Sequence, residues 1–147
     1  MTETDPRFEL FELYLGTAEK VSDRRANANS WMLSVNSAIV ALYGYLQADK
    51  LAVNAGQKAI WLLIIPGAGV FVCVAWAALL ESYRQLNRAK FEVLQMLESA
   101  FPVQPFTCEQ NAYRRHRRRG LATVERSVPA CFFLLYVAIL IAAIFRS

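Results

Sequence analysis

The sequence AIWLLIIPGAGVFVCVAWAALL, residues Ala59–Leu80, contains no Asp, Glu, Lys or Arg. A helix needs about 20 apolar residues to cross a hydrocarbon core of roughly 30 Å, so this window predicts a membrane-spanning helix. Ser127–Phe145 (SVPACFFLLYVAILIAAIF) is similarly apolar. We expect Ser127 to cap a helix there and Pro129 to lie in its first turn, where a missing N–H costs little.

A third neutral window, Trp31–Ala48 (WMLSVNSAIVALYGYLQA), is less apolar because it contains Ser34, Asn36, Ser37 and Gln47. We predict a short span whose polar edge faces other helices, since Asn36 in hydrocarbon needs a hydrogen-bonding partner. The alternative interpretation is an interfacial or core helix.

The charged residues all lie between these windows. The chain has 147 residues, of which 56% are hydrophobic and 19% are charged. Because the three windows hold no charge, the remaining 88 residues carry all 28 charged side chains. This separation excludes disorder along the whole chain and argues against one soluble core. Residues 1–30 lack the apolar core of a signal peptide, so the first span is expected to act as its own insertion signal.

The distribution of Lys and Arg predicts the orientation. Residues 1–30 contain four of these residues and residues 81–126 contain nine, whereas the loop at 49–58 contains two and the C-terminal tail one. We therefore predict a multi-pass protein of the bacterial inner membrane with a cytoplasmic N-terminus and a periplasmic C-terminus. The net charge of +4 then faces anionic lipid and does not indicate a nucleic-acid partner.

Apolar residues recur at helical spacing on both sides of the windows, as in Phe8, Phe11 and Leu15. This pattern predicts amphipathic helices that extend the first two spans into the cytoplasm. Such helices need a surface on which to bury their apolar stripes, which favours self-association or an unidentified cytoplasmic protein partner.

The predicted fold class is all-α, an integral membrane protein with three transmembrane helices, two of them extended into the cytoplasm as amphipathic helices. In chain order, the single membrane domain comprises a cytoplasmic helix at 6–30, a span at 31–48, an external loop at 49–58, a span at 59–80, a cytoplasmic helix at 81–100, a basic connector at 101–126 and a span at 127–145.

The connector holds a run of arginines that cannot form a packed core: Arg114, Arg115, Arg117, Arg118 and Arg119. Each basic residue near an anionic leaflet contributes roughly 1 kcal/mol of membrane affinity, so the run is a candidate contact for anionic lipid. A topology determinant without further role, and a nucleotide or RNA ligand, are the alternatives. Tyr113 alone provides too little aromatic surface for a base-stacking platform.

No catalytic pattern accompanies these segments. His116 is the single histidine, and it lies inside the arginine run without a neighbouring carboxylate. Cys73, Cys108 and Cys131 form neither a CxxC pair nor, with one histidine, a zinc site. Gly67 and Gly69 permit close backbone approach but form no phosphate loop. We expect no enzyme activity, no cofactor and no metal.

Three blocks resemble the RipA-like family of small octameric bacterial inner-membrane proteins. They are Tyr14–Asn36 (YLGTAEKVSDRRANANSWMLSVN), Ser82–Phe91 (SYRQLNRAKF), and the stretch from Phe101 to Glu109 together with ERSVP at 125–129 and the last span. The chain departs from the family pattern at Gln110, where the family has Trp. The resemblance implies a homo-oligomer, octameric by the family name, and it supplies no catalytic residues.

Two polar groups flank the first two spans on one predicted membrane face, and antiparallel helices would bring them together. We predict a hydrogen-bonded assembly layer, within or between subunits, in which Asp23 pairs with Arg84 or Arg88. A solvated rim of unrelated charges is the alternative. The candidate layer residues are Asp23, Arg24, Arg25, Asn27, Asn29, Asn36, Tyr83, Arg84, Gln85 and Asn87.

These observations favour a homo-oligomeric inner-membrane scaffold that presents a ring of cytoplasmic helices, with itself and membrane lipids as partners. The alternative is an oligomeric channel or membrane-disrupting effector of the stress or phage-defence type, which requires a central polar path.

Overall fold

The computed structural model of the chain is built from helices. It describes residues 6–48, 54–99, 101–115 and 121–146. In chain order the helices are α1 (Pro6–Gln47), α2 (Ala55–Glu98), α3 (Pro105–Arg115) and α4 (Leu121–Arg146). The described residues contain no strand, so the all-α class predicted from the sequence is confirmed.

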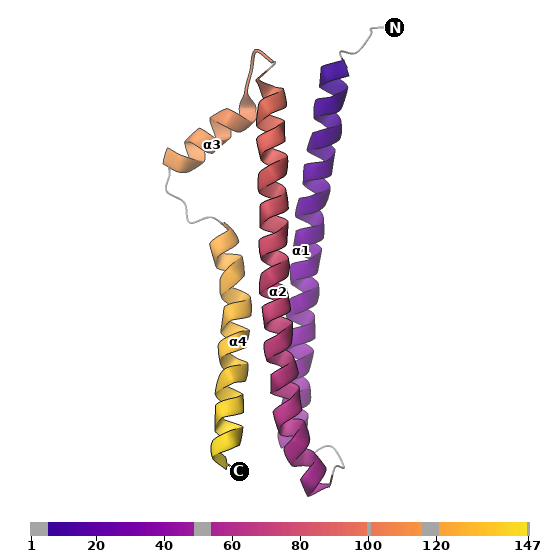
Figure 1. Cartoon of the computed structure of the whole chain (residues 1–147), viewed down its shortest axis with the longest axis vertical. Coiled ribbons are helices and arrows are strands. Elements are labelled where there is room, and N and C mark those ends of the chain that lie inside the picture. The colour runs from indigo at the N-terminus through magenta and orange to yellow at the C-terminus, as the bar shows by residue number, and fades with distance from the viewer. Residues whose placement is uncertain (1–5, 49–53, 100, 116–120, 147) are drawn as a thin grey trace.

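Helix α2 lies between α1 and α4, and short α3 projects from the end of α2 that lies beside the start of α1 (Figure 1). We call this end of the molecule the α3 end. The 42 residues of α1 and 44 of α2 give two helices about 65 Å long at 1.5 Å per residue. The 26 residues of α4 extend about 39 Å. α1 and α2 are therefore about twice as long as a hydrocarbon core is thick.

α1 runs without a break through the predicted amphipathic helix at 6–30 and most of the predicted span at 31–48. α2 likewise runs without a break through the predicted span at 59–80 and most of the predicted helix at 81–100. No Gly or Pro lies between Thr17 and Tyr43, so nothing in that part of α1 interrupts the backbone ladder. Pro66 is buried inside α2. The two long helices run antiparallel.

The contact between α1 and α2 follows helical spacing. α1 buries Ala18, Val21, Asn36 and Leu46, which all lie toward one side of the helix. α2 buries Leu80 and Leu94 together with the larger Trp76. Full burial of side chains of this size contributes roughly 1.5–3 kcal/mol each in a soluble protein, and in a membrane the same packing acts mainly through van der Waals contact.

Most of the apolar surface remains uncovered by the chain itself. Two helical segments, Gly56–Glu98 and Glu125–Phe145, are long and apolar enough to cross a membrane, with mean hydropathy of 2.3 and 2.7. Only 28% and 11% of their most apolar windows are buried, whereas core helices of soluble proteins are mostly buried. The less apolar 31–48 segment of α1 is not among these two segments. Large exposed side chains include Phe71 at 74% and Phe145 at 86%.

The stretch predicted as a connector contains α3. The carboxylate of Glu98, only 1% exposed, accepts bonds from the backbone N–H of Phe106 (2.7 Å) and from the N–H and hydroxyl of Thr107 (both 3.2 Å). These N–H groups belong to the first turn of α3 and have no partner within that helix, so a carboxylate stabilises its start. The Phe106 ring contacts the rings of Phe11 and Phe91, 6.0 Å away by centroid in each case.

The expected start of the last helix was wrong. α4 begins at Leu121, so Ser127 does not cap it and Pro129 lies in its interior. Residues 121–126 contain no Gly or Pro, and nothing in them stops a helix before the apolar window. Pro129 cannot donate to the carbonyl of Glu125, four residues earlier. Because α4 begins about one and a half turns earlier than predicted, Glu125 and Arg126 are part of this helix.

Candidate functional site

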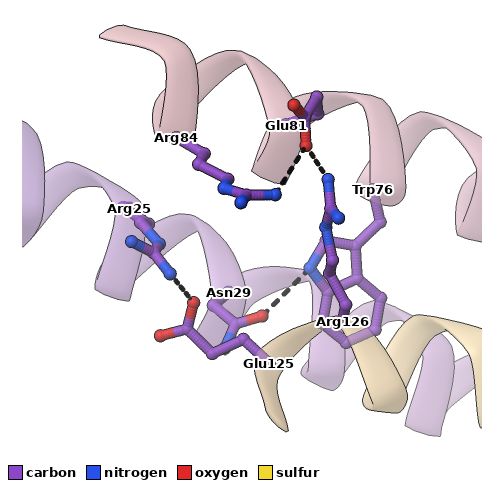
Figure 2. A network of polar contacts seen from close by, with 7 residues as sticks. All are labelled: Arg25, Asn29, Trp76, Glu81, Arg84, Glu125 and Arg126. Carbon is purple, nitrogen blue, oxygen red and sulfur yellow. Dashed lines mark hydrogen bonds and ion pairs between the residues drawn. The ribbon is translucent and has the colours of Figure 1, made fainter. Parts of the chain in front are cut away.

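A layer of ion pairs joins α1, α2 and α4 near the start of α4 (Figure 2). Arg25 of α1 pairs with Glu125 of α4, and Arg126 of α4 pairs with Glu81 of α2. Arg84 also approaches Glu81, at 3.8 Å between Nη1 and Oε2. Adjacent residues on a helix point about 100° apart, which lets Glu125 reach α1 while Arg126 reaches α2.

The Arg25–Glu125 pair is the more buried one. The two side chains are 19% and 24% exposed, against 48% for Arg126. Nε of Arg25 is buried and has no hydrogen-bond partner among the described residues. Removing one partner of such a pair therefore leaves the other charge partly desolvated, which costs more than the pair contributes when intact.

One turn along α1 from Arg25, further from the α3 end, the side chains of Asn29 and Trp76 join α1 to α2. Trp76 Nε1 donates to Asn29 Oδ1 at 3.0 Å, and the indole is 1% exposed. The ring also contacts Phe132 of α4 at a centroid distance of 6.4 Å. The buried indole thus has both an apolar environment and an acceptor for its N–H.

About two turns further along α1, Asn36 is fully buried where the three long helices meet. Its Nδ2 donates to the carbonyl of Met32 at 2.8 Å, and its Oδ1 accepts from Cys73 Sγ at 3.4 Å. The hydroxyl of Tyr136 donates to the backbone carbonyl of Asn36 at 3.1 Å. The amide therefore has partners within α1 and in α2, while its backbone also binds α4.

Gly69 makes room for Tyr136. A Cβ added at Gly69 would lie 2.6 Å from two carbons of the Tyr136 ring, closer than real carbon contacts allow. Tyr136 is 1% exposed, so its ring has little space into which to move. The expectation that a glycine here permits close approach is confirmed for Gly69. At Gly67, a Cβ would meet nothing within 4 Å.

The structure divides the predicted assembly layer into two groups. Arg25, Asn29 and Asn36 have the partners described above, in other helices of the same chain. Exposed or half-buried positions are occupied by Asp23, Arg24, Asn27, Tyr83, Arg84, Gln85 and Asn87.

The predicted pairing of Asp23 has no counterpart among the ion pairs described within one chain. Arg84 pairs with Glu81 and Arg88 with Glu92, while Asp23 is exposed. Pairing of Asp23 with Arg84 or Arg88 between subunits stays a prediction.

Sequence reasoning did not single out Glu81, Glu125 or Arg126. Their signal was present, because Glu81 and Arg126 are charged residues directly beside apolar windows and Glu125 directly precedes Arg126. The sequence marked Cys73 only as one of three cysteines without a zinc-site pattern, whereas in the structure its thiol donates to Asn36. Arg114 and Arg115 end α3, and Arg117, Arg118 and Arg119 lie outside the described residues, so lipid contact by this run stays a prediction.

Most polar side chains of this site pair with one another across helices, so the arrangement joins α1, α2 and α4. Among the described residues, no three His, Cys, Asp or Glu side chains come together in a way that could hold a metal ion.

Replacing Gly69 with Ala is expected to destabilise the fold by about 1–3 kcal/mol, because the Tyr136 ring must leave its place and its bond to α1. Unfolding in mixed micelles, followed by circular dichroism, measures this. Gly67→Ala is the matched control and should be neutral or slightly stabilising, since Ala favours helix. Equal effects of the two substitutions would contradict the packing described.

A double-mutant cycle with Arg25→Met and Glu125→Gln should give a coupling energy of about 1–3 kcal/mol, because both groups are partly buried. The Arg88–Glu92 pair, 82% and 66% exposed, is the control, and its coupling should stay below about 0.5 kcal/mol. The same unfolding assay serves both cycles. A coupling energy at Arg25–Glu125 no larger than that of the control would show that this ion pair does not stabilise the packing of α4 against α1.

A family model described as the Octameric membrane protein family (8xMP) matches residues 8–145. The match covers the ion-pair layer and all but the outermost residues of α1 and α4. Comparisons with curated proteins and with solved structures gave no significant match.

Proposed function

Since the chain belongs to the octameric membrane protein family, we propose that it assembles into a homo-octamer in the bacterial inner membrane and acts there as a scaffold. The family match over residues 8–145 carries this proposal. The mostly exposed apolar surfaces of α2 and α4 support it, because they suit contact with lipid and with neighbouring copies.

We further propose three spans, formed by residues 31–48 (the end of α1 and the residue after it), 59–80 of α2 and 127–145 of α4. The fully buried Asn36 supports a membrane position for α1, since its amide is satisfied inside the bundle. With α1 and α2 about 65 Å long, the parts of both helices near the α3 end extend beyond the hydrocarbon.

The α3 end is cytoplasmic in this proposal. Thirteen of the 16 Lys and Arg residues then lie on the cytoplasmic side, as the positive-inside rule favours. Arg25, Arg84 and Arg126 are at the level where α4 enters the membrane, close to the headgroups. The arginine run at 114–119 is proposed to contact anionic lipid, and the ring of α1 and α2 ends to receive a cytoplasmic protein.

Reconstitution in lipid tests this function. Native mass spectrometry of the protein released from nanodiscs should give eight copies, and proteoliposomes at high protein density should remain tight to ions. A monomer would contradict the scaffold. Octamers that conduct ions would favour the alternative, an oligomeric channel or membrane-disrupting effector.

A further inference from the structure

We infer that the ring closes head to tail, with the outer face of α1 in one copy packed against the α2 groove of the next copy. The outer face of α1 carries Glu12, Glu19, Asp23, Ser30, Ser34 and Ser37. The α2 groove, about 560 Å³ in volume, is lined by side chains that include Arg84, Gln85, Arg88 and Glu92. This inference rests on the octamer proposed above.

The outer face of α1 points away from α2. Asp23 is two residues from buried Val21, and Ser34 is two residues from buried Asn36. Two residues correspond to about 200° around a helix, so both side chains lie opposite the face that packs on α2. All six named residues of the face are exposed.

The part of this face within the proposed span is unsuited to lipid. It presents the hydroxyl-bearing Ser34 and Ser37, with Ser30 directly before the span, and α1 is less apolar than the two segments long and apolar enough to cross a membrane. The hydroxyls of Ser34 and Ser37 bond to carbonyls of their own helix, at 3.1 and 2.9 Å. Small side chains allow another helix to approach closely, which is how helices associate in membranes.

Lipid has better surfaces available on the same molecule. The exposed side chains of α2 and α4 include Phe71 at 74% and Leu134 at 65% exposure, whereas the exposed Trp31 of α1, at 68%, lies beside the serine-bearing face and not on it. The contrast favours lipid against the outer sides of α2 and α4, and protein against the serine-bearing face of α1.

Charge then identifies the partner surface. Within the outer face, Glu12, Glu19 and Asp23 are acidic, while Lys20 and Arg24 are rotated from Asp23 by about 60° and 100°. The α2 groove offers two exposed guanidinium groups, Arg84 at 54% and Arg88 at 82%, beside the carboxylates of Glu81 and Glu92 that they contact. Because Arg126 of α4 also pairs with Glu81, three guanidinium groups face two carboxylates at the groove. An acidic helix face and an arginine-bearing groove are complementary.

The two surfaces lie on opposite sides of the molecule. The α2 groove borders α4 and α3, because Glu81 binds Arg126 of α4 and Phe91 contacts Phe106 of α3. α1 is on the other side of α2 (Figure 1). Copies inserted in one direction form a closed ring only through two different, complementary surfaces, which this arrangement provides.

The surfaces also lie at the same height. Asn29 of α1 is level with Trp76 of α2, since the two side chains bond. In antiparallel helices, Asp23, six residues before Asn29, is then level with residue 82, within one turn of Arg84. Copies related by rotation about the membrane normal keep their heights, so Asp23 of one copy meets Arg84 of the next.

Thiol cross-linking tests the contact. In a Cys108→Ser, Cys131→Ser background that retains buried Cys73, chains with Asp23→Cys and one affinity tag are co-expressed with chains carrying Gln85→Cys and another tag. A short bismaleimide in membrane vesicles should join chains of different tag. Phe71→Cys, exposed and outside the α2 groove, replaces Gln85→Cys in the control and should give at least tenfold less product.

Native mass spectrometry of the same preparations separates the possible failures. Octamers without the Asp23–Gln85 product, or with equal product from Phe71→Cys, would overturn the head-to-tail contact and leave the octamer intact. Monomers would overturn the octamer itself. As a second readout, Asp23→Arg should lower the octamer fraction severalfold, and adding Arg84→Asp should restore it to within twofold of wild type. Failure of that rescue also counts against the contact.

Discussion

The burial of one carboxamide, that of Asn36, constrains the arrangement of the three long helices. A polar group with no access to water must find its hydrogen bonds within the protein. Here the amide bonds to Met32 and Cys73, and the adjacent backbone carbonyl receives the hydroxyl of Tyr136. Since the Tyr136 ring also fits against Gly69, a rotation or shift of any one helix would break several of these contacts together.

The other polar contacts continue from this point toward the α3 end. Trp76 bonds to Asn29 about two turns from Asn36, and the Arg25–Glu125 and Glu81–Arg126 pairs follow where α4 starts. Each layer joins residues on different helices, and each is more exposed than the one before it. The chain thus satisfies its deepest polar groups internally. The surfaces that the chain itself does not cover are the mainly apolar sides of α2 and α4 and a face of α1 that carries both polar and apolar side chains.

The sequence was sufficient for the helical class, because the apolar windows are visible in it, and it marked Arg25, Asn29 and Asn36 as polar candidates beside or within those windows. It was insufficient for the partners, since pairing Arg25 with Glu125 depends on how each helix is rotated about its axis. The start of α4 was misplaced because Ser127 and Pro129 form a strong local helix-start pattern. The helix α3 depends on Glu98, which reaches it from α2 across two prolines.

The most direct test of the central role of Asn36 is the rate at which a membrane-permeant maleimide labels Cys73 in lipid, with Cys108 and Cys131 replaced by Ser. Cys73 is 2% exposed and bonds to Asn36. We predict at least tenfold faster labelling in Asn36→Leu, equivalent to about 1.4 kcal/mol easier local opening, and no change in the exposed control Gln47→Leu. Equal labelling of Asn36→Leu and wild type would contradict it.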